Sequence, residues 1–136
     1  MKKGYKQLLD EANAEVTAIA PAEAMPLLAQ KDRVTFIDLR DPRELEREGR
    51  IPGAVHCPRG MLEFWIDPES PYHRPVFAEK KRLLFFCAGG WRSALAAKTA
   101  QDMGLTDVAH LEGGFTAWRE AGGPVESVQP RTEPKA

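Results

Sequence analysis

The stretch LLFFCAGGWRS, residues 83–93, joins three kinds of local structure. Its first four residues form a continuous apolar run, which is typical of a central strand covered on both faces. Gly89 and Gly90 favour a tight turn because glycine adopts backbone conformations that other residues resist. The alanine-rich residues 93–103 then favour a helix. This order predicts one strand–loop–helix unit of an α/β fold, with Cys87 at the carboxyl end of the strand.

Short apolar segments alternate with helical segments along the rest of the chain. The predicted strands are 17–19, 34–38, 54–56, 83–86 and 108–111. The predicted helices are 1–16, 21–30, 42–47, 60–66, 93–103 and 115–120. Such alternation predicts an α/β fold in which a parallel sheet carries helices on both faces. Ligands of these sheets bind beyond the carboxyl ends of the strands. Asp38, Cys57 and Cys87 are expected near that edge.

The chain is expected to divide into three parts. Residues 1–16 predict an N-terminal helical extension, residues 17–122 one domain, and residues 123–136 a flexible C-terminal tail with three prolines and mixed charges. The apolar face expected for the N-terminal helix comprises Tyr5, Leu8, Leu9, Ala12 and Val16.

Composition excludes several classes of function. The 136 residues include 19 Lys or Arg and 20 Asp or Glu, giving a net charge of −1 and no general attraction to nucleic acid or anionic membranes. No apolar run approaches the ~18 residues of a membrane-spanning helix, and no export signal is recognised, so a cytoplasmic location is expected. Two cysteines without a Cys-x-x-Cys pair predict neither a disulfide framework nor a zinc site, and we expect no cofactor and no metal.

Cys87 is the candidate catalytic residue. Inward-facing N–H groups of the glycine turn, the positive end of the following helix and the charge of Arg92 would all favour its thiolate form. The sequence therefore predicts a nucleophilic thiolate at neutral pH. The alternative is that Cys87 is a small buried apolar residue, which is the usual fate of a free cysteine.

A thiolate beside an arginine suits attack on phosphorus or attack on the outer sulfur of a sulfur donor. Four residues, 88–91, separate Cys87 from Arg92, whereas the cysteine phosphatases carry one more and usually place His before the Cys, where this chain has Phe86. The shorter loop suits a single sulfur atom better than a tetrahedral phosphoryl group.

Four segments in order resemble those of the rhodaneses, a family of sulfurtransferases. They are IDLR at 37–40, GRIPGA at 49–54, CAGGWRS at 87–93 and GGFTAW at 113–118, and the similarity spans residues 17–122. The resemblance implies a five-stranded parallel sheet between helices and a persulfide carried on Cys87. It also implies that the amides of 88–92 bind the sulfur, and that an ion pair or hydrogen bond near Asp38 and Arg40 supports the site.

Two residues depart from the family pattern. Arg50 replaces the usual His of the GHIPGA turn, and that His is not the nucleophile. Ala88 stands where many thiosulfate-using members carry Arg directly after the Cys, which removes one cation from the donor site.

The binding residues predicted for the donor form the loop after the cysteine. They are Ala88, Gly89, Gly90, Trp91 and Arg92, with Ser93, Asp38 and Arg40 in supporting positions. Arg92 is expected to bind the anionic part of the donor, because an arginine at the start of a helix is unfavourable without a nearby anion.

The segment 59–79 is open to two interpretations. Its apolar residues, Phe64 and Trp65 among them, form either a wall of the donor pocket or docking surface, or a small satellite core under a long loop. Arg59 is either a second cation of the site or a solvated side chain. Cys57 is expected to be buried and inert, with a resolving role as the alternative, and His110 is expected to be a satisfied core residue.

These observations predict a sulfurtransferase that moves a sulfane sulfur from a small anionic donor, of the thiosulfate or persulfide type, to a thiol, cyanide or protein acceptor. The alternatives are a sulfur-relay or docking module that turns over small donors poorly, and a cysteine-dependent phosphatase or arsenate reductase. Neither nucleic acid nor a membrane is an expected partner.

Overall fold

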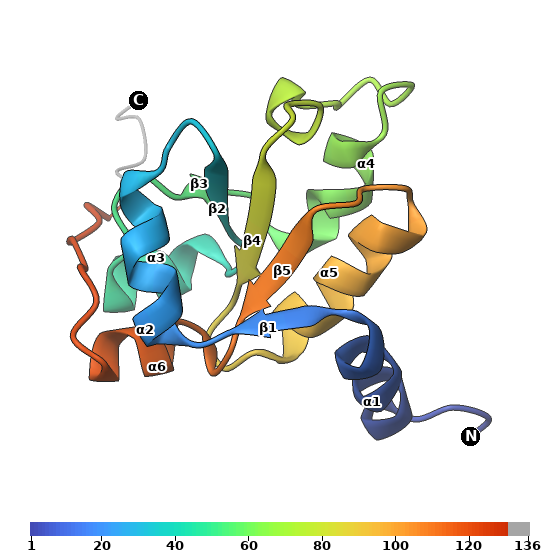
Figure 1. Ribbon diagram of the computed structural model, residues 1–136, viewed down its shortest axis with the longest axis horizontal. Coiled ribbons are helices and arrows are strands. Elements are labelled where there is room, and N and C mark those ends of the chain that lie inside the picture. The colour runs from blue at the N-terminus through green and yellow to red at the C-terminus, as the bar shows by residue number, and fades with distance from the viewer. Residues whose placement is uncertain (131–136) are drawn as a thin grey trace, which may run out of the picture.

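The protein is built on one five-stranded parallel sheet, which confirms the predicted fold class (Figure 1). The computed structural model describes residues 1–130. The strands are β1 (Thr17–Ile19), β2 (Val34–Asp38), β3 (Val55–His56), β4 (Arg82–Phe86) and β5 (Val108–Leu111), in the spatial order β1-β5-β4-β2-β3. β4 is the central strand, and all neighbouring pairs run parallel.

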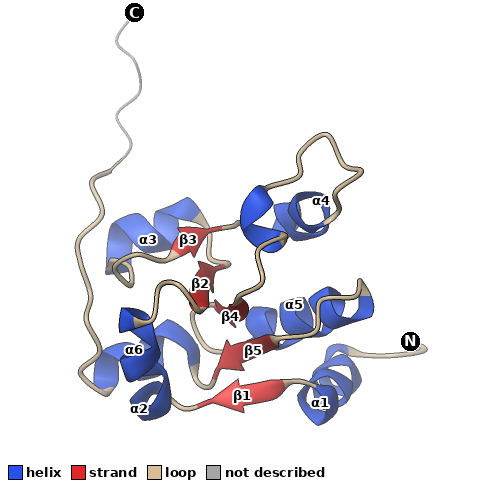
Figure 2. Ribbon diagram, turned by 45° about the horizontal axis from the view of Figure 1, so that its top comes forward, coloured by secondary structure: helices blue, strands red, loops and turns tan. Residues whose placement is uncertain are grey.

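Helices cover both faces of the sheet (Figure 2). They are α1 (Tyr5–Glu15), α2 (Pro21–Ala24), α3 (Pro42–Glu48), α4 (Leu62–Ile66), α5 (Trp91–Asp102) and α6 (Gly114–Glu120). The alternating side chains of β4 divide between two cores. Leu83 and Phe85 pack in the core shared with α4 and α5, and Leu84 and Phe86 pack in the core shared with α2 and α6.

The helices predicted at 21–30 and 1–16 match the structure only in part. The α-helix expected at 21–30 ends at Ala24, and the chain continues as a 3₁₀ helix, Met25–Ala29, because Pro26 has no N–H to donate to an α-helical hydrogen bond. In α1 the predicted apolar face is only partly buried. Leu9 and Ala12 pack with Ala94 of α5, whereas Tyr5 and Leu8 are exposed.

The segment 59–79 contains more structure than a simple loop. A 3₁₀ turn, Arg59–Met61, leads into α4, and a second one, Pro75–Phe77, precedes β4. Leu62, Ile66 and Phe77 are buried in the main core, so this segment helps to cover one face of the sheet.

The residues after α6 are partly attached to the domain. Trp118 donates its indole N–H to the carbonyl of Pro124 at 2.8 Å. Arg50 and Glu126 exchange two backbone hydrogen bonds of 2.9 Å each. Of the segment 123–136 that was predicted to be flexible, the first residues are therefore bonded to the domain, and 131–136 lie outside the described residues.

A fully buried ion pair joins the end of β2 to the elements around it. The guanidinium of Arg40 donates to both carboxylate oxygens of Asp38, at 3.0 and 2.8 Å, and to the carbonyl of Gly49 at 2.9 Å. Its central carbon lies 4.1 Å from the centre of the Phe115 ring in α6. One arginine thus holds β2, the end of α3 and α6 in fixed relation.

Replacing Arg40 by Met tests this role. The change leaves the Asp38 carboxylate buried without its partner, so we expect the free energy of unfolding to fall by about 3–5 kcal/mol. Urea unfolding measures this change in the free energy of unfolding. The control is Arg50→Met, which removes an exposed ion pair with Glu126 and should cost less than about 1 kcal/mol. Equal losses in the two variants would contradict the account.

Candidate active site

Cys87 follows β4 and lies at the base of a small pocket. Its residue exposure is 1%, yet it lines a pocket of about 290 Å³ together with Gly89, Trp91 and Arg92. The backbone N–H of Gly90 donates to the sulfur at 3.2 Å. Within residues 1–130 this is the one loop amide that donates to Sγ, so the ring of inward-facing amides expected from 88–92 is only partly formed around a single sulfur.

The loop carbonyls are held from the outside by the start of α6. The N–H of Phe115 donates to the Cys87 carbonyl at 2.8 Å, and the N–H of Thr116 donates to the Ala88 carbonyl at 3.1 Å. Gly114 makes this approach possible, because a Cβ atom there would lie 2.5 Å from the Cys87 carbonyl oxygen. The carbonyls thus point toward α6, away from the sulfur.

The Ser93 side chain lies beside the sulfur and connects it to His110. The Ser93 hydroxyl lies 3.6 Å from the Cys87 sulfur, donates to the Gly90 carbonyl at 3.2 Å, and lies 3.0 Å from Nδ1 of His110. His110 is buried in β5, and burial lowers its pKa, which favours the neutral ring. Its other ring nitrogen, Nε2, is buried and has no partner among the described residues.

His110 is therefore connected to the candidate site, which sequence reasoning missed. Its position in an apolar strand indicated a core residue, and it is buried as expected. The available signal was strand adjacency: β5 runs beside β4, and His110 is in register with Phe85, two residues before Cys87.

Arg92 does not face the pocket as a free cation. Its two terminal nitrogens each donate to a different carboxylate oxygen of Glu44, both at 2.8 Å. The hydrogen bond to Arg92 lowers the pKa of Glu44 to about 2, and the same bond raises the pKa of Arg92. The anion that was expected near Arg92 is thus supplied by the protein itself.

Glu44 is positioned by the start of α3. It accepts a hydrogen bond from the N–H of Asp41 at 2.7 Å, while the Asp41 side chain accepts one from the N–H of Arg43 at 2.8 Å. This reciprocal arrangement is a capping box, and the sequence D-P-R-E at 41–44 carries its signature. Sequence reasoning did not connect Glu44 with Arg92, which lies 48 positions later.

The side chains proposed as a wall from segment 59–79 do not line the Cys87 pocket. Arg59 pairs with Glu63 at 2.8 Å, Phe64 is exposed, and Trp65 packs beneath the Arg74 guanidinium at 4.5 Å. The satellite-packing interpretation describes Trp65 better, and Arg59 is partnered by a carboxylate of its own element rather than by the site.

Cys57 lacks the surroundings of Cys87. It is fully buried, and burial raises the pKa of its thiol to about 12. The inert thiol favoured by the sequence is therefore in accord with its environment.

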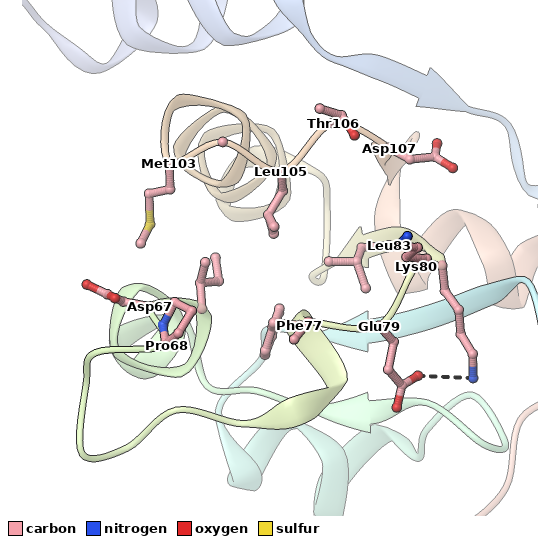
Figure 3. Close-up of a pocket in the computed structure, with 14 residues that line it drawn as sticks. Asp67, Pro68, Phe77, Glu79, Lys80, Leu83, Met103, Leu105, Thr106 and Asp107 are labelled. Carbon is pink, nitrogen blue, oxygen red and sulfur yellow. Dashed lines mark ion pairs between the residues drawn. The ribbon is translucent and has the colours of Figure 1, made fainter.

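A larger pocket lies elsewhere in the described residues (Figure 3). It has a volume of about 890 Å³ and is lined by Leu83 at the start of β4, by Phe77 and by the turn Met103–Asp107. Cys87 follows the opposite end of the same strand. No predicted site residue lines this larger pocket, so its size does not make it the better candidate.

Residues 1–130 contain neither a cluster of metal-ligating side chains nor a helix that could span a membrane. No group of three or more His, Cys, Asp or Glu side chains there is placed to hold a metal ion. None of the helices described combines the length and apolar character needed to cross a membrane.

Comparison with known proteins connects this geometry to a family. The family model described as "Rhodanese-like domain" matches residues 20–121. A mouse protein, thiosulfate sulfurtransferase/rhodanese-like domain-containing protein 3, is 31% identical over 71% of this chain, and the match covers 64% of its own length. A relative from Synechocystis is matched over 54% of its length.

Two further similarities extend over nearly the whole length of the similar protein. The human thiosulfate:glutathione sulfurtransferase is 29% identical over 74% of this chain and 95% of its own. A solved structure from Rhodopseudomonas palustris, of a protein of unknown function described as a possible tyrosine phosphatase, is 59% identical. It covers 93% of this chain and 96% of its own, with a TM-score of 0.89.

The contact between α6 and the loop is tested by Gly114→Ala. The new Cβ would meet the carbonyls of Cys87 and Ala88 at a residue with a φ of +64°, so the loop must shift. We expect the free energy of unfolding, measured with urea, to fall by about 1–3 kcal/mol more than in the control. The rate of Cys87 alkylation by iodoacetamide should also change. The control, Gly122→Ala, has a φ of +85° and nothing within 4 Å. Identical behaviour of the two variants would show that the close approach is unimportant.

Proposed function

Because the chain belongs to the rhodanese-like domain family, we propose that it is a sulfurtransferase that carries a sulfane sulfur as a persulfide on Cys87. One observation carries the proposal: the Cys87 sulfur lies at the base of a pocket with a backbone N–H donated to it at 3.2 Å. An N–H directed at this sulfur stabilises the negative charge of the attacking thiolate, and that of the thiolate regenerated when the outer sulfur leaves.

In the first step, the Cys87 thiolate attacks the outer sulfur of the donor. A sulfur–sulfur bond forms to Cys87, the bond between that sulfur and the rest of the donor breaks, and its electron pair leaves with the donor remainder. Thiosulfate would release sulfite, and an organic persulfide would release a thiolate. Each reaction balances in atoms and charge without an oxidant or a reductant.

In the second step, an acceptor removes the outer sulfur. A thiolate, cyanide or a cysteine of a protein acceptor attacks that sulfur, and the electron pair of the breaking bond returns to Cys87 as a thiolate. The leaving group is stabilised by the same groups that support the nucleophile: the Gly90 N–H and the amino-terminal end of α5. The Ser93 hydroxyl, 3.6 Å away, adds a weaker polar contact.

Hydrolysis of an aryl phosphate is the second candidate. It is favoured by the description of the Rhodopseudomonas palustris structure and by the presence of Cys87 and Arg92 in one pocket. The pairing of both terminal nitrogens of Arg92 with Glu44 opposes it, since a phosphoryl group needs such donors for itself.

Mass spectrometry of the intact protein tests the proposal. After incubation with thiosulfate or with an organic persulfide, the protein should gain one sulfur atom, and cyanide should remove it. Cys87→Ser should abolish the gain, whereas the matched variant Cys57→Ser should retain it. Sulfur found on Cys57, or release of phosphate from an aryl phosphate without any sulfur loading, would contradict the proposal.

Steady-state turnover with cyanide separates an enzyme from a relay module. A sulfurtransferase should complete many cycles per molecule, all of them dependent on Cys87. A protein that accepts one sulfur and then turns over no small donor would instead be the relay module.

A further inference from the structure

The Cys87 pocket is less positive than the presence of Arg92 alone would make it. Of the residues that line it, Cys87, Gly89, Trp91 and Arg92, only Arg92 is a cation. Both of its terminal nitrogens already bind Glu44 in a two-point contact of 2.8 Å per bond. The position after the cysteine is Ala88, which brings no further positive charge.

The carboxylate of Glu44 is held firmly in this place. Its side chain is 18% exposed, it caps α3 through the N–H of Asp41, and its low pKa keeps it ionised at physiological pH. An anion that approaches Arg92 therefore also approaches a fixed negative charge. The repulsion grows with the charge of the donor and is stronger in a partly buried site than in water.

One lining residue of the same pocket belongs to an exposed aromatic pair. Trp91 lines the pocket, and its ring centre lies 5.2 Å from that of Tyr5 at an angle of 40°. These two side chains are 63% and 53% exposed. Tyr5 comes from α1, which precedes residues 20–121 of the family match and is anchored on α5 through Leu9 and Ala12. Exposed aromatic faces favour contact with an apolar organic group.

We propose that the pocket selects singly charged organic persulfides over the thiosulfate dianion, with Glu44 as the residue that excludes the dianion and the Tyr5–Trp91 pair as the contact for the organic group. This selectivity rests on the sulfurtransferase function proposed above. Glu44 acts through Arg92 and is a specificity-determining residue, not a catalytic one.

The chemistry of the first step favours the same donor class. Attack of the Cys87 thiolate on an organic persulfide anion forms the sulfur–sulfur bond to Cys87 and releases a thiolate with one negative charge. The same attack on thiosulfate releases sulfite with two. Charge is conserved in both reactions, but the second places a doubly charged leaving group near the Glu44 carboxylate.

Glu44→Gln tests the charge argument. Glutamine still offers an oxygen to the Asp41 N–H, so the capping box is retained, while Arg92 loses its negative partner. Rates of Cys87 persulfide formation are measured by quenching the reaction at set times and analysing the protein by mass spectrometry. The donors are thiosulfate and methyl hydropersulfide. The ratio of the thiosulfate rate to the methyl hydropersulfide rate should rise on the order of tenfold.

The matched control for charge is Asp102→Asn. It removes one carboxylate that pairs with Lys98 at the other end of α5, about 16 Å along the helix from Trp91. Its ratio should equal that of the unaltered protein. A ratio that is unchanged in Glu44→Gln, or raised equally in the control, would overturn the proposal.

Tyr5→Ala tests the organic contact. The rate with benzyl hydropersulfide, relative to that with methyl hydropersulfide, should fall by about two- to tenfold. Leu8→Ala, at another exposed position of α1, should leave this ratio unchanged, and circular dichroism shows whether the helix is kept. Equal ratios in Tyr5→Ala and Leu8→Ala would remove the aromatic pair from the proposal.

The outcomes distinguish this inference from the proposed function. If no donor loads sulfur onto Cys87, the sulfurtransferase function itself is wrong. If the unaltered protein loads sulfur from thiosulfate as rapidly as from methyl hydropersulfide, and Glu44→Gln changes neither rate, the function stands and the selectivity is wrong.

Discussion

Two backbone hydrogen bonds determine the direction of the loop on which the site is built. The N–H groups of Phe115 and Thr116 bind the carbonyls of Cys87 and Ala88. These bonds turn the N–H groups of Ala88 and Gly89, which share peptide units with the two carbonyls, away from α6. The next peptide unit of the loop donates the Gly90 N–H to the sulfur. Parallel pairing of β4 with β5 brings the start of α6 beside this loop, so the sheet topology is a precondition for the site.

Two arginine–carboxylate pairs near the loop differ in burial and in role. Arg40 with Asp38 is fully buried and stacks on Phe115, so it holds α6 where the loop needs it. Arg92 with Glu44 is partly exposed and lies at the pocket. The first pair contributes to the geometry, whereas we propose that the second sets the charge that a donor meets.

The sequence predicted the central unit well, because its signals are local. Residues 83–93 alone indicated a buried strand, a tight loop and a helix, and the alternation of elements indicated the sheet. Glu44 and His110 were missed as neighbours of the site for a different reason. Their roles depend on contacts between segments distant in sequence, and single-sequence patterns do not encode such contacts. For Phe64 and Trp65 a pocket wall and a satellite core both stayed open, because composition does not say which way an apolar segment faces.

A crystal structure of the sulfur-loaded protein tests the account most directly. The account predicts a second sulfur bonded to Cys87 inside the pocket lined by Gly89, Trp91 and Arg92, with the two bonds from α6 to the loop unchanged. A second sulfur directed away from the loop amides, or a loop whose carbonyls have separated from Phe115 and Thr116, would contradict it.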